Sequence, residues 1–299
     1  MTPNELEIYT KTQGLRRCDS SHQATFSEGY LQMSGPIGFG NPVSPKGLAS
    51  LVENPPHHIS ADAIQVNFRV DPKVVNPYLP EGLSLTDDCI GYVYVADMVK
   101  VSASHPGQEF DEPQRTQYNE GLVGFYVKYD NVPGRFSAFI WVSEEWSVVF
   151  GHYMGFAKKQ ADVFKTKLQP ANPGLPKLGV GTRLRGQVDR FGTRIVDMGI
   201  TLTEKLPDDG IPSYGHRIYT YRYLPSPSPD VPDNKQLFGL NLGNATTINV
   251  WKGEGFVKFQ DGSNEELEAF QPKEIISAYY FQRGWTTDTV AELVKDYSK

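Results

Sequence analysis

The stretch Ile64-Gln-Val-Asn-Phe-Arg69 alternates apolar and polar side chains without a break. Successive side chains of a β-strand point to opposite faces, so a period of two predicts a strand with one buried face and one polar face. Just downstream, Asp71-Pro72 indicates the start of a short helix, because Asp is a favoured N-cap and Pro a favoured first helical residue. The sequence therefore predicts regular β-structure from about residue 62.

The same alternation recurs along the chain, between turns rich in proline and glycine. It predicts further strands at 83–85, 90–99, 122–129, 137–142, 183–188, 194–202, 218–223, 246–252 and 256–259. The stretch Val132-Pro-Gly-Arg135 is typical of a tight turn. Helices are predicted only at 144–154, from helical spacing of apolar residues, and at 287–297. Many short strands and few helices predict a mainly β fold, a barrel or a sandwich with peripheral α-helices.

The chain divides by pattern into two parts. Residues 1–58 contain many glycines and prolines and no sustained periodicity, so we expect a loosely structured N-terminal arm. Residues 59–299 are predicted to form a single domain. The proline-rich stretch 225–232 lies inside it and is typical of a loop, because too few residues follow for a second core.

Composition limits the possible partners. The net charge is −6 over 299 residues, which argues against a nucleic-acid partner, since no basic surplus can neutralise phosphates. The two cysteines, Cys18 and Cys89, cannot make a disulfide framework, and the scattered histidines predict no metal site. The acidic N-terminus does not resemble a signal peptide, and no apolar run is long enough to span a membrane. We therefore expect a cytoplasmic protein without a membrane partner.

The adjacent lysines Lys158 and Lys159 are the strongest candidate for a chemical centre. They follow the apolar and aromatic run Phe150-Gly-His-Tyr-Met-Gly-Phe-Ala157. A Lys-Lys pair is most often a solvated surface pair, but the end of an apolar run is an unusual place for one. An amine attacks a carbonyl only in its neutral form, which burial or a neighbouring cation favours.

The run Gly155-Phe-Ala-Lys158-Lys159 resembles the Gly-Phe-Pro-Lys-Lys signature of the acetoacetate decarboxylase family. Further segments resemble family landmarks in the same order, over about four-fifths of the chain: Phe68-Arg-Val-Asp71, Leu79-Pro-Glu-Gly-Leu83, Tyr118-Asn-Glu120, Gly186-Gln-Val188, Tyr221-Arg-Tyr-Leu-Pro225 and Pro272-Lys-Glu-Ile-Ile-Ser277. The resemblance implies a closed or cone-like antiparallel β-barrel of the acetoacetate decarboxylase-like type with a few outer helices. It also implies a homo-oligomer.

Family roles transfer to matching positions. Lys158 corresponds to the lysine that forms the Schiff base, Lys159 to its neighbour and Glu120 to an active-site glutamate. The chemistry resides in a covalent imine on lysine, so the resemblance implies neither a metal nor another cofactor. His152, Tyr153 and Phe156 are candidate substrate contacts.

The sequence departs from the family pattern around the lysines. Gly151-His152-Tyr153 stands where family members have Gly-Arg-Glu, and Ala157 replaces the proline of the signature. An arginine and an acid of true acetoacetate decarboxylases fall near Ala61 and Val93. These changes remove charge from the substrate surroundings and predict a substrate other than acetoacetate.

These residues predict a Schiff-base-forming carbon–carbon lyase that decarboxylates a β-keto acid through a lysine imine and an enamine. The first alternative is an aldolase or dehydratase that uses the same lysine on a keto acid and an aldehyde. The second is a non-catalytic relative that binds a small molecule. In all three readings the partner is a small carbonyl compound or keto acid.

The placement of Lys159 depends on the backbone at 157–160. If this segment is extended, successive side chains point to opposite faces and Lys159 does not enter the pocket of Lys158. Burial by Met154, Phe156 and the neighbouring strands would then favour the neutral amine of Lys158, with the charge of Lys159 a smaller effect.

Overall fold

The computed structural model describes residues 37–213, 215, 217–287 and 291–298. It contains two compact units, residues 1–50 and residues 51–299. In the first unit, Ile37 and Ser44 exchange backbone hydrogen bonds in an isolated bridge. Residues 1–36 of the predicted arm, with Cys18, lie outside the described residues, and the division at residue 58 stays a prediction. All features below belong to the second unit.

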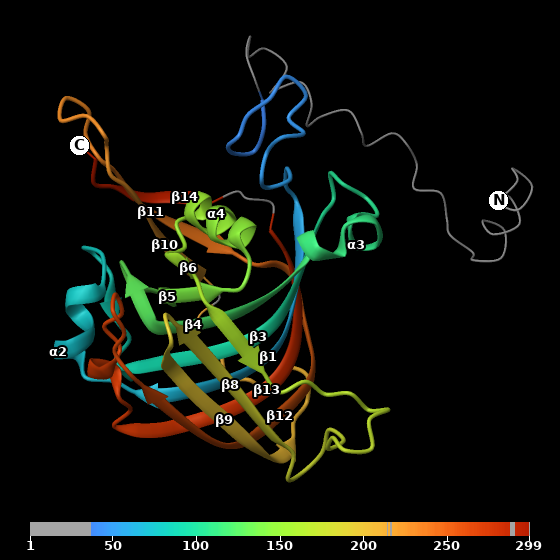
Figure 1. Ribbon diagram of the computed structural model, residues 1–299. Coiled ribbons are helices and arrows are strands. Elements are labelled where there is room, and N and C mark those ends of the chain that lie inside the picture. Colours follow the sequence, from blue (N-terminus) through green and yellow to red (C-terminus); the bar gives the residue numbers. More distant parts are fainter. Residues whose placement is uncertain (1–36, 214, 216, 288–290, 299) are drawn as a thin grey trace, which may run out of the picture. The chain divides into compact units, whose positions relative to one another are not determined.

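Strands dominate the second unit, which confirms a mainly β fold (Figure 1). The strands are β1 (His57–Arg69), β2 (Ser84–Leu85), β3 (Ile90–Ser102), β4 (Gln117–Tyr129), β5 (Val132–Val142), β6 (Lys158–Gln160), β7 (Asp162–Lys165), β8 (Arg183–Arg190), β9 (Thr193–Lys205), β10 (Arg217–Leu224), β11 (Asn234–Asn241), β12 (Gly243–Phe259), β13 (Glu274–Thr287) and β14 (Glu292–Asp296). The α-helices are α2 (Pro72–Val75), α3 (Gln108–Asp111) and α4 (Glu145–Met154), and short 3-10 turns are Asn76–Tyr78, Pro113–Arg115 and Glu268–Phe270.

The strands pair in one sheet. Its order is β14-β11-β10-β5-β4-β3-β1-β13-β12-β9-β8-β7, with β2 paired to β4 and β6 paired to β5. The pairs are antiparallel except β10–β5 and β5–β6, which are parallel. The sheet curls (Figure 1), and Gly186 of β8 packs against Val95 of β3. Because the hydrogen-bonded path of the described strands ends at β14 and β7, a closed barrel stays a prediction.

Several local predictions are confirmed. The periodic segment 144–154 is helix α4, and the proline-rich stretch 225–232 is a loop between β10 and β11. The Asp71 side chain caps α2 by accepting a hydrogen bond of 2.9 Å from the backbone N–H of Lys73. Strands 246–252 and 256–259 are one strand, β12, which continues through Gly253. Glycine fits there because a Cβ would collide with the carbonyl of Thr201 on β9.

Two predictions at chain reversals and ends are wrong. Val132–Arg135 belongs to β5, and the chain reverses instead at Asp130-Asn131. Asp130 and Asn131 have positive φ angles of 47° and 66°. Asp and Asn tolerate such angles, and hairpin turns require them. The predicted helix at 287–297 is also wrong, because residues 292–296 form β14 on the free edge of β11. Val294 and Tyr297 pack against the core there, so a tertiary partner overrides the local pattern.

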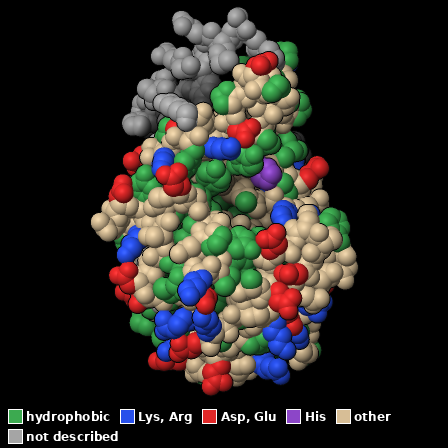
Figure 2. Space-filling model, turned by 90° about the vertical axis from the view of Figure 1, so that its left-hand side faces the viewer, with side chains coloured by type: hydrophobic (Ala, Val, Ile, Leu, Met, Phe, Trp, Pro, Cys, Tyr) green, Lys and Arg blue, Asp and Glu red, His purple; other side chains and the backbone are tan. Residues whose placement is uncertain are grey.

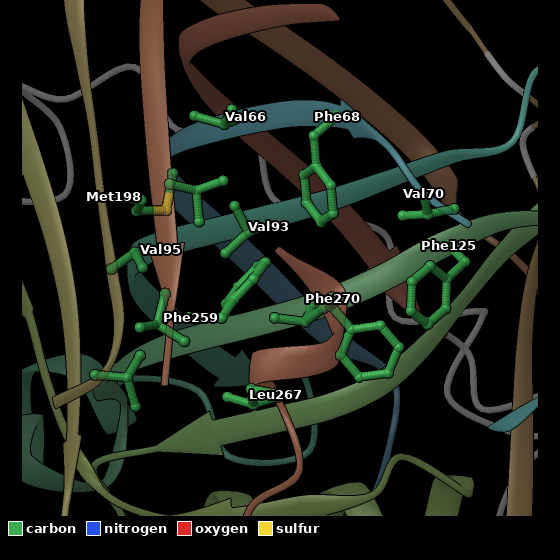
Figure 3. Packing of buried hydrophobic residues seen from close by; sticks show 14 of the residues in the cluster. Val66, Phe68, Val70, Val93, Val95, Phe125, Met198, Phe259, Leu267 and Phe270 are labelled. Atoms are coloured by element: carbon green, nitrogen blue, oxygen red, sulfur yellow. The ribbon is translucent and has the colours of Figure 1, made fainter. Parts of the chain in front are cut away.

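Strands β1, β3 and β4 are buried on both faces. Ile64, Val66 and Phe68 point into the hydrophobic core, as predicted, together with Val93 and Phe125 (Figure 3). Their intervening neighbours point the other way. The expectation of a single buried face is wrong there, because Gln65 is 7% and Asn67 0% exposed. Gln65 Nε2 donates to Asn67 Oδ1 at 2.7 Å, which offsets the cost of burying both amides.

A buried polar cluster holds α4 against the strands. Glu53 accepts from Lys100 Nζ at 2.6 Å and from Gln108 Nε2 at 2.6 Å, and it also pairs with Arg115. The Lys100 ammonium lies 4.9 Å from the centre of the Trp146 ring on α4. The His57 ring meets that of Phe150, also on α4, edge to face at 4.9 Å. This cluster therefore fixes the helix that later supports the site.

Acidification is expected to destabilise the protein through His57. Burial, and then the charge of Lys100, lowers the pKa of His57 from 6.5 to about 4. The unfolded chain therefore binds the proton first, so stability is full above pH 6.5 and falls as the pH drops from 6.5 towards 4. This one group is expected to cost about 2 kcal/mol between pH 7 and pH 5.

Denaturant unfolding of His57→Gln at pH 7 and pH 5 tests this expectation. The loss between the two pH values should shrink by about 2 kcal/mol relative to the wild type. His58→Gln is the matched control, because the adjacent His58 is exposed. An undiminished loss in His57→Gln would contradict the assignment.

One face of the protein carries side chains of both charges (Figure 2). On the face in Figure 2, Lys and Arg side chains are interspersed with Asp and Glu side chains. Among the described helices, none is both long and apolar enough to cross a membrane. The predicted cytoplasmic location stays a prediction.

Candidate active site

A cavity of about 420 Å³ lies on the face of β1, β3 and β4 opposite the hydrophobic core. On β3 the residues Val93 and Val95 face the core, so Tyr92 and Tyr94 face the cavity. Residues of α4, β5, β6, β10, β11, β12 and β13 also line it, together with residues 208, 209, 211–213 and 215. The volume falls in the range of small-molecule sites.

Lys158 and Glu120 form a buried ion pair in this wall. Lys158 Nζ lies 2.8 Å from Glu120 Oε2, and the two residues are 6% and 7% exposed. Nζ also donates to Ser147 Oγ of α4 at 3.1 Å. Strand pairing brings the two together, because Ile140 of β5 pairs with Lys158 while Val142 pairs with Glu120. An amine and a carboxylate thus share one hydrogen bond at a cavity surface.

Two tyrosines frame this pair, and one of them donates a hydrogen bond to it. Tyr94 donates to Glu120 Oε1 at 3.0 Å. Burial, and then the negative charge of Glu120, raises the pKa of Tyr94 well above its ordinary value. The same two causes raise the pKa of Tyr118, which is hydrogen-bonded to Ser147 and whose ring lies 5.2 Å from Lys158 Nζ. Both phenols therefore stay protonated, and Tyr94 fixes the orientation of the carboxylate.

The end of α4 aims Lys158 at the cavity. Gly155 ends the helix in the left-handed conformation, at φ 82°, and its N–H donates to carbonyls of the last turn. The chain then turns back, and Phe156 N–H donates to Gly151 O at 2.8 Å. The Lys158 side chain passes over Gly151, where a Cβ would lie 2.7 Å from Lys158 Cγ and closer still to Cδ. Because Gly151 has no side chain, the Lys158 side chain can occupy the space above it and reach the cavity.

Lys159 points to the other face of β6. Its Nζ lies 2.9 Å from Glu265 Oε2 and donates to the carbonyl of Asn264 at 2.9 Å. It lines a separate hollow with Tyr78, Phe139 and Glu266, outside the cavity of Lys158. The extended backbone of β6 thus separates the two lysines, as the alternation of strand side chains requires.

The sequence matches a known protein family. The family model described as acetoacetate decarboxylase (ADC) matches residues 40–298. The chain belongs to the acetoacetate decarboxylase family. No functionally curated protein gives a significant match.

Solved structures of this family share the fold. The enduracididine biosynthesis enzyme MppR, complexed with the condensation product of pyruvate and imidazole 4-carboxaldehyde, is 24% identical. The alignment covers 89% of this chain and 100% of MppR, with a TM-score of 0.81. An acetoacetate decarboxylase-like enzyme from Sphingomonas wittichii RW1 is 25% identical, with 87% and 100% covered and a TM-score of 0.81. Acetoacetate decarboxylase from Legionella pneumophila subsp. pneumophila str. Philadelphia 1 is 15% identical, with 95% and 98% covered and a TM-score of 0.70.

Some of the other residues predicted to surround the substrate in this family member lie at the cavity, and others lie away from it. Phe156 lines the cavity. His152 is exposed, and its ring bonds to the Lys158 carbonyl at 2.8 Å, so it supports the turn rather than facing the cavity. Tyr153 is half-buried and does not line the cavity either. Ala61 lines it, whereas Val93 lies in the hydrophobic core.

Several cavity residues were missed by sequence reasoning. Tyr94 and Ser147 touch the lysine–glutamate pair, and Arg135 and Arg283 line the cavity from β5 and β13. The alternation of Tyr92 and Tyr94 with valines was a usable signal, because it places two phenols on one face. Within the described residues, no group of three or more His, Cys, Asp or Glu is placed to hold a metal ion. A reaction without metal or other cofactor stays a prediction.

Proposed function

We propose that this member of the acetoacetate decarboxylase family forms an imine between Lys158 and a keto acid and then breaks a carbon–carbon bond as a decarboxylase. The observation that carries the proposal is the buried amine of Lys158, 2.8 Å from the Glu120 carboxylate in a cavity wall. A carboxylate within hydrogen-bond reach of an amine can move the protons that imine formation requires.

The first steps use the ion pair directly. Glu120 accepts a proton from Lys158, and the neutral Nζ attacks the ketone carbon. Glu120 returns the proton to the carbinolamine oxygen, which leaves as water and gives an iminium ion. Tyr94 keeps the carboxylate in place by donating to its other oxygen.

The iminium ion then accepts electrons. The bond between the α-carbon of the β-keto acid and its carboxylate breaks, and carbon dioxide leaves. The electron pair of that bond forms the double bond of an enamine. Protonation of the enamine carbon regenerates the iminium, and water releases the ketone and the lysine. Glu120 is the proposed proton carrier, and Phe156 is a proposed substrate contact. Lys159 lies outside this cavity, so we propose that it supports β6 through Glu265.

A second candidate is aldol addition with loss of water. The same enamine would attack an aldehyde carbon instead of taking up a proton. The related enzyme MppR, complexed with a condensation product of pyruvate and an aldehyde, favours it. So does the cavity, whose aromatic wall extends well beyond Lys158 through Tyr92, Phe281 and Trp285.

Borohydride trapping tests the proposal. The protein is incubated with pyruvate, acetoacetate or 2-oxohexanoate, reduced, digested and analysed by mass spectrometry, while released carbon dioxide is measured in parallel with acetoacetate. We expect added mass on the peptide that contains Lys158. Release of carbon dioxide supports decarboxylation, whereas adducts without it, together with condensation of pyruvate and an aldehyde, support the aldol reaction. No adduct with any keto acid would identify a non-catalytic binding protein. The predicted homo-oligomer is a separate proposal, to be tested by light scattering.

A further inference from the structure

The cavity contains two arginines whose charge the fold leaves uncompensated. Arg135 of β5 and Arg283 of β13 are half-buried in its wall. The Nε atoms of both are buried and have no hydrogen-bond partner among the described residues. Among the described residues, no acid forms an ion pair with either guanidinium. Buried charges are ordinarily paired, so an unpaired pair of cations in a cavity points to a missing anion.

The two guanidinium groups are close enough to act on each other. Burial, and then the positive charge of Arg135, lowers the pKa of Arg283. Folding therefore holds two like charges together at a cost in free energy, and an anion between them would remove that cost.

The other polar groups nearby cannot supply the missing charge. Tyr126 pairs with Arg135 across β4 and β5, and its hydroxyl accepts from Gln65 Nε2 at 3.1 Å. Both groups are neutral. Asp208 and Asp209 also line the cavity, but they are exposed. Glu120 already pairs with Lys158.

Arg135 lies apart from Lys158 along the cavity wall, opposite Tyr126 rather than Glu120 on β4. The Tyr92 ring packs on that of Tyr126 at 5.0 Å, beside Arg135, whereas Tyr94 holds Glu120. Tyr92 and Tyr94 are two residues apart on β3, which corresponds to roughly 7 Å of strand. Tyr92 pairs with Gly124 of β4, which lies between Glu120 and Tyr126, the partner of Arg135, along that strand.

We propose that Arg135 and Arg283 bind a terminal carboxylate of the substrate, several bonds away from the carbonyl group that reacts with Lys158. The substrate class is thus a keto acid whose far end carries a second carboxylate. Arginine suits this role because its planar fork pairs with a carboxylate through two hydrogen bonds. The carboxylate held there stays on the product, since ion pairing stabilises it. The inference rests on the proposed imine at Lys158 for the position of the carbonyl.

Matched ligands separate this proposal from the proposed function. 2-Oxoadipate and 2-oxohexanoate differ only in whether the chain ends in a carboxylate or a methyl group, and hexanoate and hexanamide differ in whether it ends in a carboxylate or a neutral amide. The first pair forms imines and is scored by borohydride trapping. The second pair has no ketone and is scored by calorimetric binding. We expect the carboxylate-ended member of each pair to half-saturate the protein at roughly tenfold lower concentration or less.

Arginine variants identify the group responsible. In Arg135→Met and Arg283→Met the preference should fall to about twofold or less, while trapping of 2-oxohexanoate is retained. Arg283→Lys should restore part of the preference. Arg222→Met is the matched control, because Arg222 is also half-buried in a strand but does not line the cavity. Circular dichroism confirms that each variant is folded.

The outcomes are distinct. Equal half-saturation within both pairs overturns the arginine proposal, as does a preference that survives in both methionine variants. Tighter binding of hexanoate than of hexanamide that depends on the arginines, without any trapped adduct, supports the anion site and contradicts the imine. Adducts that form without any preference for the carboxylate-ended ligands support the imine and contradict the anion site.

Discussion

Lys158→Met is expected to gain no mass from any keto acid after borohydride reduction, and to lose turnover by roughly a thousandfold or more. Methionine follows the lysine side chain as far as Cε, with sulfur in place of Cδ, and lacks the amine. No other described lysine lies in the cavity wall, so no second nucleophile can replace it there. Mass spectrometry of the intact and digested protein measures the first effect, and product formation measures the second.

Loss of folding must be separated from loss of chemistry. Removing Lys158 leaves Glu120 buried without its partner, which costs roughly 3–5 kcal/mol in comparable pairs. The double variant Lys158→Met/Glu120→Gln removes both charges and should recover much of that stability. It should remain unable to form an adduct.

Lys159→Met is the matched control for the neighbouring lysine. Its amine pairs with Glu265 on the opposite face of β6, so adduct formation on Lys158 should persist in this variant. An adduct in Lys158→Met that maps to Lys159 would reverse the assignment of the two lysines.

Gly151→Ala is expected to lower the rate of adduct formation by roughly a hundredfold while the protein stays folded. The new methyl group would meet the Lys158 side chain, since a Cβ at 151 would lie 2.7 Å from Lys158 Cγ. The lysine must then move by about an ångström, and misplacement of that size costs about two orders of magnitude in rate. Samples reduced with borohydride after increasing incubation times give the rate of adduct formation.

The helix itself should tolerate this change. Alanine is about 1 kcal/mol better than glycine inside a helix, which offsets part of the steric cost. Val148→Ala, at a half-buried position of α4, is the control and should leave the rate within about twofold. If Gly151→Ala trapped keto acid at the wild-type rate, the lysine would not depend on the space above Gly151.

The family signature singles out Lys158 because it joins residues that are adjacent in sequence. The same short run left the backbone at 157–160 either extended or bent, and in the structure Lys158–Gln160 is a strand. Glu120 required the second landmark, Tyr118-Asn-Glu120, and the structure places it in hydrogen-bond contact with the lysine. Arg135 and Arg283 could not be inferred, since strands far apart in the sequence bring them together.

The fold was predictable where periodicity was long and unopposed. The alternation around Val66 and the helical spacing in α4 both reflect burial against a large interior, and both elements are present. The error at 287–297 has a different origin. Its pattern suits either a helix or a strand, and the unpaired backbone groups of β11 decide the matter by offering a hydrogen-bonded edge.

The two buried faces of β1, β3 and β4 have a consequence for how this protein can diversify. The side chains of one face, such as Val66 and Val93, pack in the core, and those of the other, such as Ala61 and Tyr92, line the cavity. Because neighbouring positions along a strand belong to different faces, a mutation at one position can change the shape of the cavity without removing a core side chain. Selection can therefore act on the cavity and on the core as nearly separate traits.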